Sequence, residues 1–570
     1  MRRRAGLRRK AFALLTDSAH RHLTSDHPAE HGGKAKGRHS RMWPGVSSEN
    51  VAIQDLTQAP MMHSTPCGRT FRSIPGTQEV HTMLKRIGAI AGIVIIALVA
   101  VALIRTALFK SQQVAVKPAP RVDIDVNAAA GRFARALRFR TISDIDPAKV
   151  DNQAFSDFYA FLDSTFPLVK ATLVKEVVNG SSILYTWKGS DPKARPILLM
   201  GHSDVVPVEA GTENAWKHQP FAGEIADGCV WGRGAQDVKV NVMSVLESFE
   251  YLLKERYTPK RTICLAIGHT EETLDQEGNG KIAELLQSRG VRFEMVVDEG
   301  GSITKGLLGG VAAPVALVGT AEKGHLALEL AVTAESGHAA MPPKETAAGI
   351  LCAAVSRIEK NQYPLRIAGV TKQMFQTVGP EMPFGNRLAL ANLWLLGGVV
   401  RSQLAASNSM ASVLHTTIAP TMLQGSQREN VLPIKATGVV DFRIMPGESV
   451  ESVTERARAT IKDDRVKITV LPGATEPTPV TDAGLPAYKT LERTIREVFP
   501  GVIVTPFLCF ARTGSRSYIS ISDSTFRFSP VINTTESLAQ MHGTNERLAV
   551  DNYGDSIRFY IQLIRNVDKG

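Results

Sequence analysis

Several polar residues of this 570-residue chain have the types and spacing that suit metal binding or proton transfer. His202 and Asp204 stand two apart, so an imidazole could bind a metal while the carboxylate orients its other nitrogen. Asp237 follows a glycine-rich stretch, and in the Glu271–Glu272 pair one carboxylate could bind a cation while the other accepts a proton from water. Taken singly, each motif also fits a polar loop or a capping turn. Together they form one candidate set for metal binding and proton transfer.

The elements that must position these residues alternate between apolar strands and helices. The strands cover 195–200, 261–267 and 295–297, and the helices cover 241–253 and 281–287. Alternation of this kind predicts a mostly parallel sheet. Because sites in such sheets form at the carboxyl ends of the strands, we expect His202, Glu271 and Asp298 to share one site.

A second region, residues 314–470, has a different pattern. It is close to strand–helix–strand–strand–helix–strand, which predicts a two-layer α+β domain inserted into the first. The strands are expected at 326–333, 415–423 and 436–444, and the helices at 347–358 and 450–461. Residues 360–412 are rich in Met and Leu and stay unassigned. The first domain then comprises 127–313 and 471–570, which gives an α/β fold class with a mostly parallel-sheet catalytic domain.

The composition argues against cysteine ligands and shows a basic N-terminal region. The five cysteines are scattered without a CxxC pair, which argues against a disulfide framework and against a cysteine-based zinc site. The net charge is +11, and residues 1–82 carry many of the basic residues with little apolar periodicity. We interpret 1–82 as a disordered arm without a function of its own, although such an arm could contact nucleic acid or anionic lipid. Met83 also resembles a natural N-terminus, so 1–82 could be a mis-called start of translation.

An uncharged apolar run, Ile87 to Ile104, lies within residues 83–110 and predicts a membrane anchor. Its length is just enough to cross a hydrocarbon core of about 30 Å. Lys85 and Arg86 precede the run, which favours a cytoplasmic N-terminus and a catalytic domain on the extracytoplasmic side. The alternative is a cleaved signal peptide with its cleavage site near 100–102, but the apolar run continues past that point. A polar linker is expected at 111–126.

The motifs together resemble one known family. In order they are HSDVVPV from 202, GRGAQD to 237, EE at 271, DEGG from 298 and HGTNER from 542, with GHAAMPP from 337 and NVLP from 430 in the inserted domain. Residues 127–570 resemble the M20 metallopeptidases, in particular the carboxypeptidase S and N-acyl-amino-acid hydrolase branch. The resemblance implies a zinc-dependent hydrolase that cleaves the amide bond of a peptide or N-acyl amino acid next to a free carboxylate.

The resemblance also implies a metal-ligand set. Two Zn²⁺ ions, or Co²⁺ or Mn²⁺ in their place, would be held by five residues. His202 and Asp298 would bind one ion, Glu272 and His542 the other, and Asp237 both. Relatives often have a cis peptide after the bridging aspartate, so we expect Asp237–Val238 to be cis.

Further roles follow from the same resemblance. Glu271 would be the general base, Asp204 would orient His202, and His338 would stabilise the oxyanion, supplied on closure or by a second subunit through the inserted lid or dimerisation domain. Substrate contacts are expected at Asn430, Arg443, Gly514 and Arg516. The chain departs from the family pattern at 511–517, where a stretch usually resembling GGTDSRH reads ARTGSRS.

Two other functions remain open within this fold. One is a deacetylase or desuccinylase of amino-acid intermediates, which the predicted membrane anchor argues against because such biosynthesis is cytoplasmic. The other is a catalytically silent binding protein, which the intact set of ligands and general base argues against. A nucleic-acid partner would depend on the N-terminal arm alone and is not expected.

Overall fold

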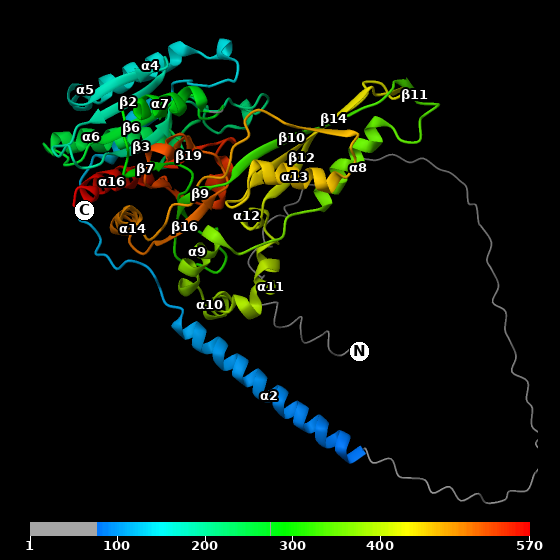
Figure 1. Cartoon of the computed structure of the whole chain (residues 1–570). Helices are drawn as coiled ribbons and strands as arrows, with labels where there is room; N and C mark the ends of the chain where they lie inside the picture. The colour runs from blue at the N-terminus through cyan, green and yellow to red at the C-terminus, as the bar shows by residue number, and fades with distance from the viewer. Residues whose placement is uncertain (1–76, 274, 570) are drawn as a thin grey trace, which may run out of the picture. The chain divides into compact units, whose positions relative to one another are not determined.

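The structure, a computed structural model, describes residues 77–273 and 275–569. Residues 81–570 form one of the two units into which the chain divides. Most of the predicted basic arm, up to residue 76, lies outside the described residues. The first described element is the long helix α2 (Thr77–Leu108), which contains the apolar run (Figure 1). Residues 109–125 then form neither helix nor strand before α3 (Val126–Ala136).

A ten-stranded, mostly parallel sheet organises the larger part of this unit. Its central strands β6 (Ile263–Gly268), β3 (Ile197–His202), β7 (Met295–Asp298) and β17 (Thr525–Arg527) are parallel neighbours. The remaining strands are β1 (Val174–Val178), β2 (Ser182–Trp187), β8 (Ile303–Thr304), β9 (Val315–Glu322), β16 (Ile503–Cys509) and β18 (Ile532–Asn533). The three strands predicted to lead into the site are therefore adjacent, and the predicted fold class is confirmed for this sheet.

Helices cover both faces of the sheet because its central strands are apolar on both sides. Ile197 and Leu199 of β3 join one core, while Leu198 and Met200 join the other. The first core is closed by α3, α4 (Asn152–Thr165), α5 (Pro167–Thr172), α6 (Lys239–Lys254), α14 (Pro486–Val498) and α16 (Val550–Val567). The second is closed by α7 (Lys281–Ser288) and the helical turn 514–521. This arrangement leaves the carboxyl ends of the strands free to form a site.

A second, four-stranded antiparallel sheet has the order β12–β14–β10–β15. The strands are β10 (Gly324–Thr333), β12 (Thr417–Gln424), β14 (Lys435–Ile444) and β15 (Val466–Val470), and helices α8 (Ala347–Lys360) and α13 (Val450–Ile461) share their core. The predicted order of strands and helices is thus confirmed. The boundary at 314 differs, because β9 belongs to the large sheet and only Gly324 begins the second. The role of this region as a lid or dimerisation domain stays a prediction.

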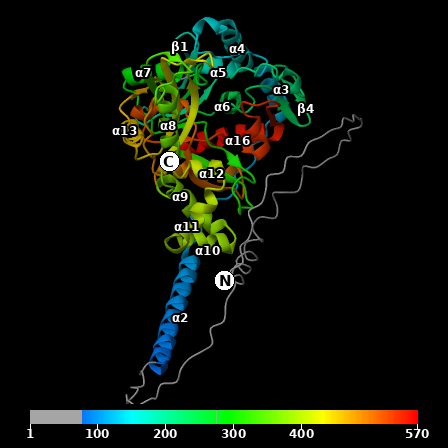
Figure 2. The ribbon, with the colours of Figure 1, turned by 90° about the vertical axis from the view of Figure 1, so that its right-hand side faces the viewer.

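The unassigned stretch 360–412 is helical. It contains α9 (Gly369–Val378), α10 (Phe384–Ala391), α11 (Leu393–Leu404) and the short α12 (Asn408–Ser412). Helix α9 packs on β16 through Met374 and Phe375, in a small core that includes Ile503. Helices α10 and α11 lie beside the C-terminal end of α2 in both views (Figure 1, Figure 2).

Candidate metal centre

The parallel strands bring the predicted ligands together because they end at the same edge of the sheet. His202 is the last residue of β3 and pairs with Gly268, the last residue of β6. Glu271 and Glu272 follow β6 after a short turn, and Asp298 ends β7. Buried apolar strands thus carry polar residues to one place, as the sequence predicted.

The first cluster consists of His202, Asp237 and Glu299. Nε2 of His202 lies 3.2 Å from Oδ1 of Asp237 and 3.2 Å from Oε1 of Glu299. The imidazole is 1% exposed, and its Nδ1 lies 2.9 Å from the backbone oxygen of Asp204 and 3.3 Å from the Oδ1 atom of that residue. Asp204 therefore holds the ring with Nε2 aimed into the cluster, which is the orienting role expected of it.

The second cluster consists of Asp237, Glu272 and His542. Nε2 of His542 lies 2.9 Å from Oδ2 of Asp237 and 3.3 Å from Oε1 of Glu272. Asp237 therefore turns one carboxylate oxygen to each histidine. The Asp237–Val238 peptide is cis, as predicted.

A buried ion pair holds the loop that carries Asp237. Oε1 of Glu546 accepts hydrogen bonds from the backbone N–H groups of Gln236 and Asp237, and Oε2 accepts one from Arg233. Arg233 and Glu546 are 2% and 0% exposed. The GRGAQD and HGTNER motifs are therefore paired in space, and Glu546 is a positioning residue that the sequence analysis did not single out.

The structure revises one expected ligand, since Glu299 and not Asp298 joins the first cluster. Successive side chains of an extended strand point to opposite sides. Asp298 turns away, and its Oδ2 accepts a hydrogen bond from the backbone N–H of Ser515 at 2.7 Å. Glu299 turns toward His202. The DEGG motif contains both carboxylates, and the position at which the strand ends decides which of them faces His202.

Glu271 lies beside both clusters without belonging to either. Its Oε2 is 3.9 Å from Nε2 of His202, and its side chain lines the cavity. Burial raises the pKa of Glu271 well above its usual range, with His202 partly opposing the shift and Glu299 adding to it. Its position beside both clusters suits a general base that takes a proton from water and later returns it.

The donor set fits two divalent cations. It offers two imidazole nitrogens and three carboxylates in two groups that share Asp237, which is chemistry that zinc accepts, and cobalt or manganese can use similar ligands. Glu272 Oε1 is buried, lies 3.3 Å from Nε2 of His542 and accepts no hydrogen bond from the described residues. Without a cation, burial raises the pKa of Glu299 to about 8, and contacts with Asp237 and Glu272 raise that of His542 to about 10. A cation must displace such protons, so we expect metal affinity to rise with pH.

A cavity of about 690 Å³ opens over these clusters. Its wall includes Glu271, Glu272 and His542 on one side and Phe510, Val531, Leu538 and Met541 elsewhere. Three more basic residues line it, namely His325, Arg443 and Arg512. Asp441 accepts hydrogen bonds from Nε2 of His325 at 2.6 Å and from Nε of Arg443 at 3.2 Å.

Arg512 differs from the other basic residues of the wall. It is half-buried and makes no hydrogen bond or ion pair with any residue in the described part of the chain. It occupies a position where the family pattern quoted above has glycine, so the departure at 511–517 places a guanidinium in the cavity wall that no described residue pairs with. The departure is visible in the sequence, but the motif alone assigns no role to Arg512.

The remaining expected substrate residues lie away from the cavity wall. His338 and Asn430 are exposed in the strand pair β11 (Gly337–His338) and β13 (Val431–Leu432) and its adjoining turn, where Asn430 O accepts a hydrogen bond from Ala339 N–H. Within one chain the structure does not bring them to the clusters. Their roles stay predictions that require closure or a second subunit.

Gly514 and Arg516 do not line the cavity and instead pack against buried polar residues next to the site. A Cβ at Gly514 would lie 2.6 Å from Nδ2 of Asn279 and 2.7 Å from Oδ2 of Asp275, so a larger residue would require these buried side chains to shift. Arg516 pairs with the fully buried Glu322 at 3.2 Å, and Arg527 pairs with the same carboxylate at 2.7 Å. Both expected substrate residues thus hold the 511–517 loop in place, and the structure does not place them on the wall.

Comparison with known proteins agrees with this geometry. Residues 198–566 match the sequence profile of peptidase family M20/M25/M40. The chain belongs to this family, and the class of protein that its fold and site define is an amide-bond hydrolase. The predicted family is therefore confirmed.

Relatives of known name are similar over most of their length. The chain is 38% identical to the N-fatty-acyl-amino acid synthase/hydrolase PM20D1 of Xenopus tropicalis, over 76% of this chain and 84% of that protein. It is 28% identical to carboxypeptidase S of Saccharomyces cerevisiae, over 78% and 84%. The M20 metallo-carboxypeptidase of Sulfolobus solfataricus has a TM-score of 0.57 at 16% identity, covering 79% of this chain and 100% of that chain. The last likeness concerns the fold alone.

Proposed function

We propose that this chain is a two-metal hydrolase that cleaves the amide bond of an N-acyl amino acid or peptide next to a free carboxylate. The observation that carries the proposal is the sharing of Asp237 by two ligand clusters beside Glu271, at the wall of one cavity. Two bound Zn²⁺ ions would lower the pKa of water and polarise the amide carbonyl. His202, Asp237 and Glu299 would hold one ion, and Asp237, Glu272 and His542 the other.

The chain's own residues supply the proton transfers and the binding. The Glu271 carboxylate takes a proton from the attacking water and passes it to the leaving nitrogen. Asp204 keeps His202 in place, and Glu546 keeps the Asp237 loop in place. The apolar wall at Phe510 suits an apolar acyl group, which agrees with the N-fatty-acyl substrates in the names of several relatives.

Arg512 is the residue best placed to receive the substrate carboxylate. Arg443 and His325 already share the charge of Asp441, whereas Arg512 has no anionic partner among residues 77–273 and 275–569. A guanidinium pairs a carboxylate through two parallel hydrogen bonds. Arg443 then helps through its remaining donors, and His338 and Asn430 complete the site from a closed lid or a second subunit.

Arg512→Gln is expected to raise KM for an N-acyl amino acid by about 10- to 100-fold, because a hydrogen bond to a charged group contributes roughly 1.5–3 kcal/mol. The same substrate as a C-terminal amide has no carboxylate and should be affected little. Steady-state kinetics on both substrates gives the comparison, with the exposed Arg428→Gln as the matched control. An equal effect on acid and amide would assign Arg512 a structural role.

The proposed reaction is tested on a panel of N-acyl amino acids and dipeptides with the zinc-loaded full chain in detergent. We expect turnover of substrates with a free carboxylate and an apolar acyl group, followed by release of the amino acid. Rapid hydrolysis of acetyl or succinyl derivatives alone would favour the deacylase alternative. Two bound metals with no turnover on any substrate would favour a silent binding protein.

The proposal includes a membrane location. Among the described residues, one helix, His81–Leu108, is long and apolar enough to cross a membrane by length and composition. Its basic flank at Lys85 and Arg86 supports an N-terminus inside and a catalytic domain outside. A homodimer through the inserted region is proposed as the second source of His338 and Asn430.

A further inference from the structure

Helices α10 and α11 present an apolar face that no described residue covers. Phe384 of α10 is 62% exposed, and Trp394, Leu395 and Val399 of α11 are 52%, 48% and 53% exposed. Trp394 and Gly398 are one helical turn apart, and so are Leu395 and Val399. The two pairs therefore form neighbouring rows on α11. Exposed large apolar side chains gathered in this way mark an interaction surface.

The same helix pair also contacts the end of α2. The Asn392 side chain, which is fully buried, donates hydrogen bonds to Ala102 O at 3.0 Å and to Thr106 Oγ1 at 3.2 Å. Arg387 donates to Thr106 O at 3.0 Å, and Arg105 donates to Ala391 O at 3.3 Å. Polar groups on both partners are matched, so this contact is specific.

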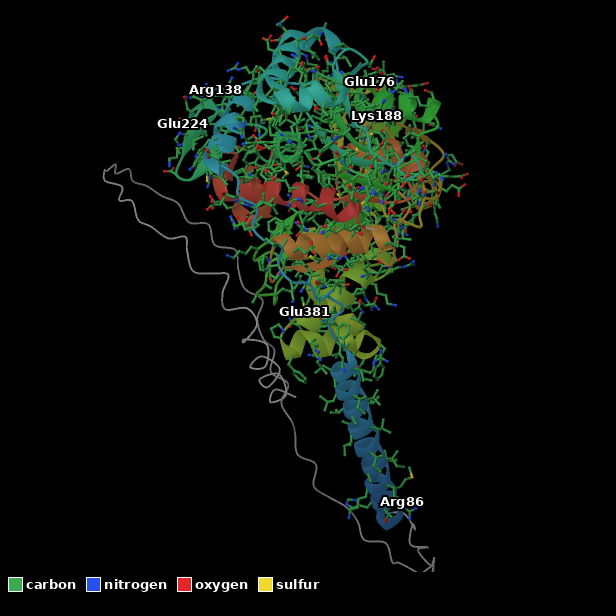
Figure 3. All side chains as sticks on the ribbon, turned by 90° about the vertical axis from the view of Figure 1, so that its left-hand side faces the viewer. Arg86, Arg138, Glu176, Lys188, Glu224 and Glu381 are labelled. Atoms are coloured by element: carbon green, nitrogen blue, oxygen red, sulfur yellow. The ribbon has the colours of Figure 1, made fainter. Side chains whose placement is uncertain are left out.

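The position of the contact along α2 indicates the depth in the bilayer at which α10 and α11 would lie. The apolar run ends at Ile104, and Ala102 stands two residues before it, or about 3 Å at 1.5 Å per residue. In a membrane-spanning α2 the contact would therefore lie where the hydrocarbon meets the headgroups. Figure 3 places Arg86 at the far end of α2 from Glu381, which precedes α10.

The chemistry of the helix pair matches that level of a bilayer. Trp prefers the membrane interface, where its ring is buried and its N–H stays hydrated. Residues 361–413 contain four basic residues and one acidic residue, which suits anionic headgroups; the basic ones are Arg366, Lys372, Arg387 and Arg401. Most of the large apolar side chains of α2 are exposed as well, and Asn392 joins the helix pair to the end of α2.

We propose that α10 and α11 form a second, interfacial membrane contact, with Phe384, Trp394, Leu395 and Val399 inserted among the lipids beside the exit point of α2. The inference rests on the proposed anchoring by α2. Because α9 packs on β16 and Phe510 and Arg512 follow that strand, the contact ties the cavity wall to the bilayer surface. A cavity held at a constant distance from the bilayer surface would favour substrates that partition into lipid.

The test uses the full chain in vesicles of phosphatidylcholine and phosphatidylglycerol at neutral pH. Subtracting the fluorescence of Trp394→Phe from that of the wild type isolates Trp394 among the five tryptophans. Nitroxide lipids labelled near the headgroup should remove most of this difference signal, and lipids labelled near the chain end should remove less. Leu395→Asp combined with Val399→Asp should abolish lipid quenching, whereas Val174→Asp combined with Val177→Asp in exposed β1 should not.

Three other outcomes are distinguishable. Quenching of Trp394 by aqueous acrylamide but not by lipid would overturn the proposal. Protection from both quenchers would overturn it as well, because a second copy or another protein would then cover the face. Resistance of the chain to extraction by alkaline carbonate reports on the membrane anchoring by α2 alone. Release by alkali, with quenching of Trp394 by lipid still present, would contradict the anchoring by α2 and support the interfacial contact of α10 and α11.

Discussion

Glu271→Gln is expected to lower kcat by about 10²-fold or more, since general base catalysis contributes 10²- to 10⁴-fold. Glutamine has nearly the same shape but cannot accept the proton of the attacking water. KM should change little because Glu271 is not among the residues proposed to hold substrate. Bound metal should also be unchanged, because Glu271 lies outside both ligand clusters.

Steady-state kinetics and metal analysis of the same preparation check this result. Glu359→Gln is the matched control, since Glu359 is an exposed carboxylate on α8. A variant that keeps wild-type kcat with both metals bound would remove Glu271 from the mechanism. Loss of metal along with kcat would instead make Glu271 a ligand, and the division of labour between Glu271 and Glu272 would be wrong.

Asp237→Asn is expected to abolish binding of at least one metal and to lower kcat/KM by about 10³-fold or more. Each carboxylate oxygen of Asp237 faces a different histidine, His202 at 3.2 Å and His542 at 2.9 Å. An amide supplies no negative charge and only one oxygen, so one cluster loses its shared ligand. A metal ion contributes several kcal/mol to such a reaction, and each 1.4 kcal/mol is a factor of ten.

Metal content by elemental analysis, before and after dialysis against chelator, separates binding from catalysis in this variant. Asp298→Asn is the informative comparison, because Asp298 was the ligand expected from the sequence and the structure replaces it with Glu299. Asp298→Asn should keep two metals, and Glu299→Gln should lose one. The reverse pattern would restore the original expectation and contradict the geometry.

Much of the fold could be predicted because the sequence pattern reflects local physical constraints. The apolar segments before His202, Glu271 and Asp298 are strands buried on both faces, and that burial requires the uninterrupted apolar runs that the sequence displays. The second sheet followed from alternating strands and amphipathic helices. Residues 360–412 resisted prediction, because α10 and α11 bury one side on α2 and expose an apolar side, which blurs the amphipathic period.

The sequence by itself determined the family, the strand ends that carry the candidate ligands and four of the five residues in the two clusters, because residue type and order along neighbouring strands specify them. Tertiary structure alone decided between Asp298 and Glu299, since one residue of register reverses the direction of a side chain. It also decided that Arg443 pairs with Asp441 while Arg512 pairs with no other residue that the structure describes, and that Glu546 holds the Asp237 loop. Such pairings join residues far apart in the chain, and no local pattern encodes which partner each charge finds.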